Sequence, residues 1–513
     1  MAARRDSGQL VPVSMLRLRR RSSPAAAFDL PDPDGLARAI VDGKRQLDVL
    51  TRNELSGVSE ACRAAPPARS TADGEYLIPH TGPVPLPAAL SHRLLEATHL
   101  WIAVEEGAAI VMDDEEQALF LELRDGRAPA DLAAALAHAG VDELDVAWER
   151  INDLIGRLAI GGFIRGVHGY TDRWKPNPRR FMRLHLTQRC NLTCVHCYAD
   201  SSPHADGHDE LPVERWHQLL DDFADAGGER VLFTGGEALV YRGCADLLEH
   251  ARARGLDVTL FSNGILVDRY LDVIKRCVDH VQISIDGPDA ETNDPIRGEG
   301  SFARGKHAVD VLVAAGLHVR ISMVVMAQNL DAMRERFLPF ARQWGGAVEF
   351  RLGYGVARHG RGEDLGDPLE IHDVRPIVDG LLEQLEGQGG PRIARSTKGC
   401  GYAEQVVVAP DGTVHPCHLL DGALTHIDAQ PMEALIAKLV HTIDEYDVDH
   451  TVGCNRCDIR NLCGGSCRIL NGKTSGNRRI TSCTAFDKLH RLHNLALTFS
   501  ENAGTVAVDP DWE

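Results

Sequence analysis

Short apolar runs alternate with longer segments in which apolar residues recur at helical spacing. The apolar runs predict strands, and the i, i+3, i+4 spacing predicts helices. Repeated strand–helix units build parallel sheets, so about six of them predict an α/β fold with a partial (β/α)6 barrel. The strands are predicted at 181–186, 230–233, 257–261, 280–285, 318–325 and 347–352, and helices at 213–226, 266–277, 302–315 and 330–344.

A different pattern precedes the barrel. Residues 84–168 predict a compact domain, in which a hairpin at 100–104 and 109–112 is followed by helices at 115–123, 129–139 and 141–158. Residues 1–83 are rich in Ala, Arg, Pro and Ser, with one helical stretch at 33–64 and a breaker-rich link at 66–87. This extension has no assigned function, and either disorder or a small helical cap fits its composition.

Ten of the thirteen cysteines fall into two ordered arrays. The first is the Cys-x3-Cys-x2-Cys run of Cys190, Cys194 and Cys197, and the second contains Cys400, Cys417, Cys454, Cys457, Cys463, Cys467 and Cys483. Thiolates in such arrays are typical ligands of iron–sulfur clusters, because soft sulfur suits iron. Zinc is the alternative for both arrays, with His196 as a further ligand of the first. The remaining Cys62, Cys244 and Cys277 are predicted to be buried free thiols.

Small and polar residues follow the predicted strands. The first array comes after the first strand, Thr234-Gly235-Gly236-Glu237 after the second, Ser262-Asn263-Gly264 after the third and Ser284-Ile285-Asp286-Gly287 after the fourth. In barrels of this kind, active sites gather at the carboxyl ends of the strands. These four elements are therefore predicted to meet at one site.

Together, the first array and the strand-end motifs resemble the radical S-adenosylmethionine (SAM) superfamily. The resemblance implies that Cys190, Cys194 and Cys197 hold a [4Fe–4S] cluster whose fourth iron binds SAM. Reductive cleavage of SAM then gives a 5'-deoxyadenosyl radical, chemistry that the cofactors supply. The SAM contacts implied are Gly235 and Gly236, which lack a Cβ, with Glu237, Ser262, Asn263, Ser284 and Arg297.

The second array resembles the SPASM domain, which carries two auxiliary [4Fe–4S] clusters and would span residues 387–500, after a barrel at 177–386. The resemblance assigns the first auxiliary cluster to Cys400, Cys417 and Cys467. It assigns the second to Cys454, Cys457, Cys463 and Cys483, making three clusters in all. Because no cysteine lies between Cys277 and Cys400, the fourth ligand of the first auxiliary cluster is predicted to be open, a substrate thiolate, Ser396 or Thr397.

The hairpin and helices of residues 84–168 resemble a winged-helix peptide-binding domain called the RiPP recognition element, related to the carrier protein of pyrroloquinoline quinone synthesis. In that family, a leader peptide adds a strand to the sheet edge. The alternative is a structural or nucleic-acid-related winged helix, because a fold does not specify a function.

These resemblances imply a radical SAM maturase of a ribosomally synthesised precursor peptide. It would form a C–S or C–C crosslink or another oxidative modification, with electrons from a flavodoxin- or ferredoxin-like reductant. The alternatives are a protein maturase that forms formylglycine and a non-enzymatic iron–sulfur or zinc scaffold. No catalytic acid or base is assigned, although Tyr198, Asp286 and Tyr354 lie near the expected site.

Composition limits the partners and the location. The formal net charge of -19 argues against a general nucleic-acid surface. No run approaches eighteen consecutive apolar residues, so no membrane span is predicted, and a cytoplasmic location is expected. In a large chain without a recognisable signal peptide, many cysteines favour metal binding or redox use over disulfides.

Overall fold

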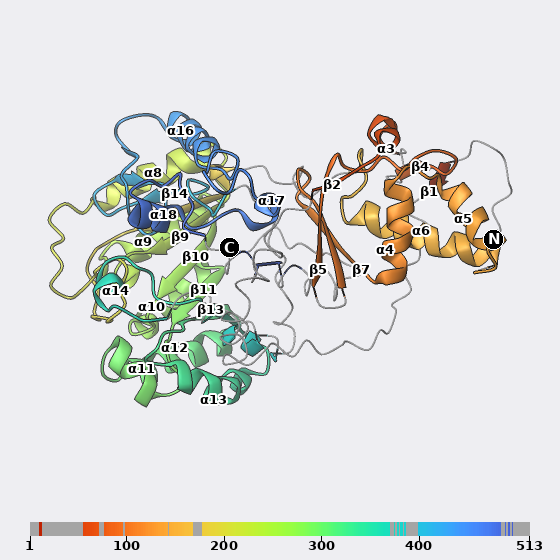
Figure 1. Cartoon of the computed structure of the whole chain (residues 1–513). Coiled ribbons are helices and arrows are strands. Elements are labelled where there is room, and N and C mark those ends of the chain that lie inside the picture. Colours follow the sequence, from red (N-terminus) through yellow and green to blue (C-terminus); the bar gives the residue numbers. More distant parts are fainter. Residues whose placement is uncertain are drawn as a thin grey trace.

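The computed structural model describes most of the chain between residues 55 and 483. The ranges described are 10–12, 55–70, 76–95, 98–141, 143–167, 177–369 and 399–483, with single positions between 374 and 385 and between 488 and 495. These residues form three sheets (Figure 1). The smallest pairs β1 (Leu10–Pro12) and β3 (Arg69–Ser70) with β4 (Tyr76–Pro79).

The largest sheet has six parallel strands in chain order. They are β8 (Phe181–His185), β9 (Arg230–Thr234), β10 (Asp257–Ser262), β11 (His280–Ser284), β12 (His318–Val324) and β13 (Val348–Gly353). Each strand pairs in parallel with the next one along the chain. The parallel α/β core predicted from the apolar runs is therefore confirmed, and all six strands lie within two residues of their predicted bounds.

Helices connect these strands, as a parallel sheet requires. They are α8 (Val213–Asp225), α9 (Cys244–Ala253), α10 (Val267–Cys277), α11 (Ala290–Arg297), α12 (Ser301–Ala314) and α13 (Leu330–Ala341), with 3-10 turns η2 (Pro178–Arg180), η3 (Ala238–Val240) and η4 (Arg342–Trp344). The predicted helix at 330–344 is found as the α-helix α13 followed directly by the 3-10 turn η4. Helices α9 and α11 were not predicted.

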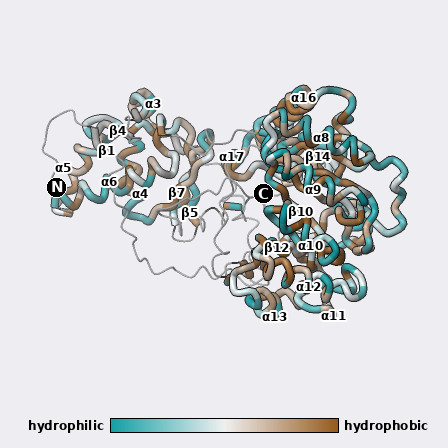
Figure 2. The backbone as a smooth tube through the Cα atoms, turned by 180° about the vertical axis from the view of Figure 1, so that it is seen from behind, coloured by the Kyte–Doolittle hydropathy of each residue, from teal (hydrophilic) through white to brown (hydrophobic). Residues whose placement is uncertain are grey.

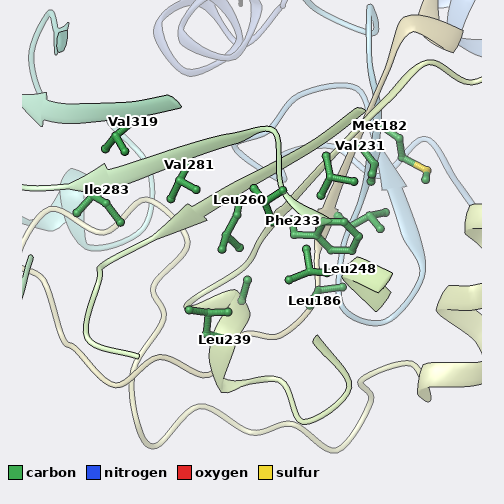
Figure 3. Close-up of a cluster of buried hydrophobic side chains, with 14 of the residues drawn as sticks. Met182, Leu186, Val231, Phe233, Leu239, Leu248, Leu260, Val281, Ile283 and Val319 are labelled. Carbon is green, nitrogen blue, oxygen red and sulfur yellow. The ribbon is translucent and has the colours of Figure 1, made fainter. Parts of the chain in front are cut away.

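One face of the sheet is apolar and packs under the helices. Alternate residues of each strand supply this core, including Met182, Val231, Phe233, Leu260 and Ile283 (Figure 3). The residues between them point to the other face, as the two-residue period of a strand requires. There, the Arg183 guanidinium lies 5.7 Å from the centre of the Phe261 ring. Parallel sheets are usually apolar on both sides. A polar inner face is therefore unusual and indicates a functional role for this face.

The cysteine-rich segment continues the same sheet. Strand β14 (Val406–Val408) pairs in parallel with β8, and β15 (Thr413–His415) and β16 (Thr425–His426) follow in antiparallel order. The helices of the segment are α14 (Arg361–Asp364), α16 (Met432–Glu445), α17 (Arg460–Cys463) and α18 (Arg468–Ser475). The second cysteine array is thereby joined to the strand that precedes the first.

A separate unit precedes the barrel (Figure 1, orange). Its sheet has the order β2-β5-β6-β7 and is antiparallel, with β2 (Leu55–Gly57), β5 (Ala89–Leu95), β6 (Thr98–Ala103) and β7 (Ala108–Met112). The helices are α3 (Glu60–Ala64), α4 (Asp114–Arg124), α5 (Pro129–His138) and α6 (Leu144–Ile160). The predicted hairpin and the three helices after it are confirmed.

The helix predicted at 33–64 is wrong at residues 55–57 and is confirmed only at its end. Leu55–Gly57 is a strand, and only Glu60–Ala64 is helical, while residues 33–54 lie outside the described part. Pairing with β5 stabilises the strand, and such a tertiary contact overrides local helical spacing. Val58 and Cys62 also pack in the same core as Trp101, so the core of this unit begins well before residue 84.

Hydropathy follows these layers. In Figure 2, hydrophobic stretches of the chain lie mainly inside the barrel, whereas the loops at its outer edge are largely hydrophilic. The three cysteines outside the arrays, Cys62, Cys244 and Cys277, are buried as predicted. In the part of the chain that is described, no helix is both long and apolar enough to cross a bilayer.

Candidate active site

The first cysteine array lies in the loop that follows β8. Cys190 and Cys194 are buried, Cys197 is half-buried, and the three pack with Leu192 and Ile265 in one small apolar cluster. Burial is the main reason why the pKa of the Cys190 thiol is raised to about 12, and burial also raises the pKa of Cys194. Such thiols ionise when a metal binds, so these three cysteines are suitable ligands for the irons of an iron–sulfur cluster.

The Gly235-Gly236 turn holds the cysteine loop. The Gly236 N–H donates to the Thr187 carbonyl at 2.7 Å, and the Glu237 N–H donates to the Arg189 carbonyl at 3.0 Å. A Cβ on Gly236 would lie 2.4 Å from the Arg189 carbonyl oxygen, and one on Gly235, whose φ is +145°, would lie 2.6 Å from that of Thr187. The close approach that needs glycine is therefore to the chain's own backbone.

Glu237 joins the second strand end to the third. Its buried carboxylate accepts hydrogen bonds from the Ser262 hydroxyl at 3.0 Å and from the Asn263 N–H at 2.8 Å. Burial raises the pKa of Glu237, and these hydrogen bonds act in the opposite direction. Glu237 and Ser262 thus bond to each other and fix the end of β10.

Asn263 brings the end of β10 to the cysteines. Its amide nitrogen donates to Asn191 Oδ1 at 2.6 Å and lies 3.8 Å from Cys190 Sγ. Ser284 ends β11 further along the sheet, opposite Ser322 of β12, and is half-buried. Of the seven predicted SAM contacts, six lie around the cysteine loop, and Ser284 lies on the neighbouring strand end.

Arg297, the sixth of these, is held by Asp286. The Asp286 carboxylate is buried and accepts from Arg297 NH1 at 2.6 Å, while His196 Nε2 lies 3.2 Å away. Burial would raise the pKa of Asp286, but His196, Arg297 and the Val324 N–H outweigh it and hold that pKa below its usual range. Asp286 is therefore a fixed anion that orients two cation-forming side chains.

Two polar atoms of this group have no hydrogen-bond partner among the described residues. They are Arg297 Nε and His196 Nδ1, and both are buried. Buried polar atoms are almost always satisfied, so an unmatched pair beside Cys194 indicates that a polar ligand belongs there. The Arg297 carbonyl lies 3.9 Å from Cys194 Sγ, and the carboxylate of SAM fits the guanidinium. The residues present thus fit both the cluster and SAM.

The sequence suggests His196 only as a zinc ligand. Its place between Cys194 and Cys197 was the available signal, but the partner that orients it, Asp286, lies ninety residues along the chain. Nothing in local spacing predicts that contact.

Aromatic side chains lie between the two cysteine arrays. The Tyr198 ring, next to Cys197, meets the His418 ring, next to Cys417, edge to face with centroids 5.9 Å apart. His185, at the end of β8, also meets the Tyr198 ring edge to face, with centroids 6.4 Å apart. His185 is buried, and its Nε2 has no hydrogen-bond partner in the described structure.

Three cysteines of the second array, which the resemblance assigns to one cluster, lie near one another. Cys400, Cys417 and Cys467 lie close enough to influence one another electrostatically, and burial raises the pKa of Cys417 to about 12. Ser396 and Thr397, proposed from sequence as further ligands, lie outside the described residues.

The other four cysteines lie along two adjacent segments. The Cys457 N–H donates to the Cys454 carbonyl at 2.8 Å, and Cys457 and Cys463 pack against the same apolar cluster. The segment before Cys483 runs beside this turn, because the Thr481 N–H donates to the Val452 carbonyl at 3.1 Å.

Within the described ranges, no three His, Cys, Asp or Glu side chains converge as ligands of one metal ion. A cluster does not require such convergence, since each thiolate binds its own iron.

A comparison with known protein families finds a match that covers this site. Residues 184–340 match the model of the Radical SAM superfamily, and the match includes the first cysteine array, the Gly-Gly turn, Asn263, Asp286 and Arg297. The chain contains a radical SAM domain. Such domains bind SAM and a [4Fe–4S] cluster, and the three cysteines and the unmatched polar atoms of this site fit both.

The similarity to known proteins extends over more residues than this domain. The chain is 30% identical over 250 residues to the mycofactocin maturase MftC of Mycolicibacterium smegmatis, a match covering 45% of this chain and 62% of that protein. It is 27% identical to the subtilosin biosynthesis protein AlbA of Bacillus subtilis, over 60% of this chain and 71% of that protein. It is 26% identical to the AdoMet-dependent heme synthase of Nitratidesulfovibrio vulgaris, over 58% of this chain and 93% of that protein. The chain thus spans less than two thirds of the first relative.

Proposed function

We propose that this chain is a radical SAM maturase that modifies a ribosomally synthesised precursor peptide. The observation that carries the proposal is the joining of a radical SAM domain to a second cysteine array through one continuous sheet. The likeness to a mycofactocin maturase and a subtilosin biosynthesis protein supports a peptide as substrate.

The residues at the carboxyl ends of β8–β11 have distinct roles in this proposal. Cys190, Cys194 and Cys197 hold the cluster, which with SAM supplies the 5'-deoxyadenosyl radical that abstracts hydrogen from the substrate. Arg297 binds the SAM carboxylate, and Asp286 holds the Arg297 guanidinium in place. Asn263 fixes the cysteine loop against the end of β10.

The second array would hold two auxiliary clusters. Cys400, Cys417 and Cys467 would bind the first. Tyr198 follows Cys197, and its ring meets that of His418, which follows Cys417. A substrate residue near Tyr198 would therefore lie between the first cysteine array and this auxiliary cluster. The second would be bound by Cys454, Cys457, Cys463 and Cys483. Clusters held by these cysteines would supply an electron acceptor for the formation of a new C–S or C–C bond, or would provide a site that binds the substrate directly.

The N-terminal unit would bind the leader of the precursor. In the described sheet, β2 covers the edge of β5, and β7 is the opposite edge strand. An extended peptide adds to such an edge through backbone hydrogen bonds. A flavodoxin- or ferredoxin-like protein would supply electrons.

Two measurements test the proposal. Anaerobically reconstituted protein should release 5'-deoxyadenosine on reduction, a Cys194→Ala variant should not, and the matched control Cys277→Ala, which changes a buried thiol outside the arrays, should behave as wild type. A Cys194→Ala variant with normal 5'-deoxyadenosine release would contradict the site assignment.

The second measurement concerns the substrate. A precursor peptide encoded near this gene should change mass when co-expressed with the chain, and it should bind the full chain more tightly with its leader than without it. Equal affinity for both forms would exclude leader recognition, and an unchanged mass would count against this precursor as the substrate.

Haem formation is the second candidate, because the match to the AdoMet-dependent heme synthase covers 93% of that protein. Haem measured in a haem-deficient host expressing the chain or its Cys194→Ala variant separates the two candidates. Haem restored only by the wild-type chain would favour this reaction over peptide modification.

A further inference from the structure

A short segment after β13 packs directly on the loop that carries the first cysteine array. This linking segment, residues 356–366, contains α14 and lies beyond the part of the chain that matches the Radical SAM family model. A Cβ on Gly360, whose φ is +55°, would lie 2.5 Å from the Tyr198 carbonyl oxygen. A Cβ on Gly362 would lie 3.1 Å from the carbonyl oxygen of His196. The backbone of the linking segment is therefore in close contact with the backbone of the cysteine loop.

Arg361 makes four hydrogen bonds to this loop. Its backbone N–H donates to the Cys197 carbonyl at 3.0 Å, and its Nε donates to the Cys194 carbonyl at 2.9 Å. One terminal nitrogen of the guanidinium pairs with the Asp200 carboxylate at 2.6 Å, and the other donates to the Ser201 carbonyl at 2.7 Å. A single residue thus joins the last two cysteines of the array to the turn that follows them.

The backbone conformation of Asp200 depends on such support. Its φ is +52°, in the left-handed region that residues with a Cβ seldom adopt. The Asp200 N–H donates to the Cys197 carbonyl at 3.3 Å, so the chain turns sharply just after the last cysteine. A residue in this conformation persists only where surrounding contacts hold it, and the ion pair with Arg361 is one of these contacts.

The linking segment also contacts the part of the chain that carries the second array. Lys473 of α18 pairs with Glu363 of α14, and its Nζ donates to the Arg358 carbonyl at 2.6 Å (Figure 1). Helix α18 directly follows Cys467, which is its N-cap residue. The linking segment is thus bonded both to the loop of the first array and to the helix that follows a cysteine of the second.

We propose that Arg361 is a positioning residue for the first cluster, because it holds the loop of Cys190, Cys194 and Cys197 in the conformation that binds iron. It acts through the carbonyl groups of the loop and through Asp200. A loop that is ordered before the iron binds loses less conformational entropy on binding, and outer contacts of this kind orient the ligands of metal sites. This inference rests on the assignment of the cluster to these cysteines within the proposed function.

The test uses the full chain, as apoprotein and after anaerobic reconstitution. Arg361→Ala removes the guanidinium and leaves room for a free guanidinium ion, whereas Arg361→Lys keeps the charge without the planar set of donors. The matched control is Arg276→Ala. The Arg276 guanidinium also bonds a carboxylate and a backbone carbonyl, but these belong to helices of the barrel instead of the cysteine loop.

Hydrogen exchange of the apoprotein reports on the loop without a cluster. The peptide of residues 190–202 should exchange about tenfold faster in Arg361→Ala than in the wild type, because three charge-assisted hydrogen bonds are lost. Exchange should be intermediate in Arg361→Lys and unchanged in the control. Millimolar guanidinium, which is too dilute to unfold a domain, should restore slow exchange in Arg361→Ala.

Three results of this experiment would overturn the proposal. They are equal exchange in Arg361→Ala and the control, no effect of guanidinium, and exchange that is equally faster in the barrel strands, which would indicate a general loss of structure. If Arg361→Ala does not fold, Arg361→Lys decides by the same comparison. Faster exchange of its loop supports the proposal, and wild-type exchange overturns it.

Iron content then tests the cluster itself. On reconstitution, Arg361→Ala and Cys194→Ala should each lose up to about four irons per chain, the content of one cluster. Guanidinium added before reconstitution should restore iron in Arg361→Ala and not in Cys194→Ala. Wild-type iron content in Arg361→Ala would overturn the positioning role. Wild-type iron content in Cys194→Ala would instead contradict the cluster assignment, which the exchange measurement on the apoprotein does not use.

Discussion

Replacing Asp286 by Asn tests how the guanidinium of Arg297 is held. The Asp286 side chain is 1% exposed and that of Arg297 12%, with 2.6 Å between them. Removing one partner of a buried pair costs about 3–5 kcal/mol, because the other charge is left without compensation. Asparagine keeps an acceptor for the Val324 N–H, so we expect the lower end, about 3 kcal/mol.

Calorimetry of the apoprotein measures this effect. For a domain of 150–250 residues, 1 kcal/mol corresponds to about 2–4 °C in Tm, so the transition of the radical SAM domain should fall by about 6–12 °C. The matched control is Asp268→Asn, which breaks a pair with His307 in which both side chains are mostly exposed. That pair should contribute less than about 1 kcal/mol.

The pH dependence follows from the sign of the shift. The folded-state pKa of Asp286 is depressed, so its stabilising contribution is complete above the ordinary aspartate range and is lost as pH falls through the folded value. The wild type should therefore remain more stable than Asp286→Asn from about pH 8 down to about pH 5. A variant as stable as the Asp268→Asn control, or a difference that vanishes by pH 6, would refute the ion-pair reasoning.

Three further predictions concern other parts of the chain. Gly236→Ala should lower the iron content of the first cluster, because its Cβ would meet the Arg189 carbonyl at 2.4 Å, whereas Gly380→Ala, where nothing lies within 4 Å, should load iron as wild type does. Phe233→Ala, in the fully buried barrel core, should lower the free energy of unfolding by about 3–5 kcal/mol in chemical denaturation. Asp113→Ala should cost about 1 kcal/mol in the same measurement, since it removes the N-terminal capping box of α4.

Much of the barrel and its site follows from local patterns. The apolar runs located β8–β13 because buried parallel strands are short and continuously apolar on their helix-facing side. The residues after those strands come together because carboxyl ends of parallel strands share one edge of the sheet. That rule placed Gly236 and Asn263 beside the cysteines without any knowledge of their contacts.

Other features could not be predicted from the sequence, for physical reasons. Strand β5 carries Ser91 and Arg93, whose buried polar side chains interrupt the apolar pattern, and their partner Asp458 lies in another domain. Strand β2 has helical spacing, but pairing with β5 decides its conformation.

The sequence by itself determined the order of the six barrel strands, the grouping of ten cysteines and the strand ends that carry the site, because these depend on spacing along the chain. Only the tertiary structure decided that Asp286 orients Arg297 and His196, that β14 joins β8, and that Arg93 reaches Asp458 across 365 positions. These contacts depend on which surfaces pack together, and packing between distant segments leaves no periodic signal in the chain.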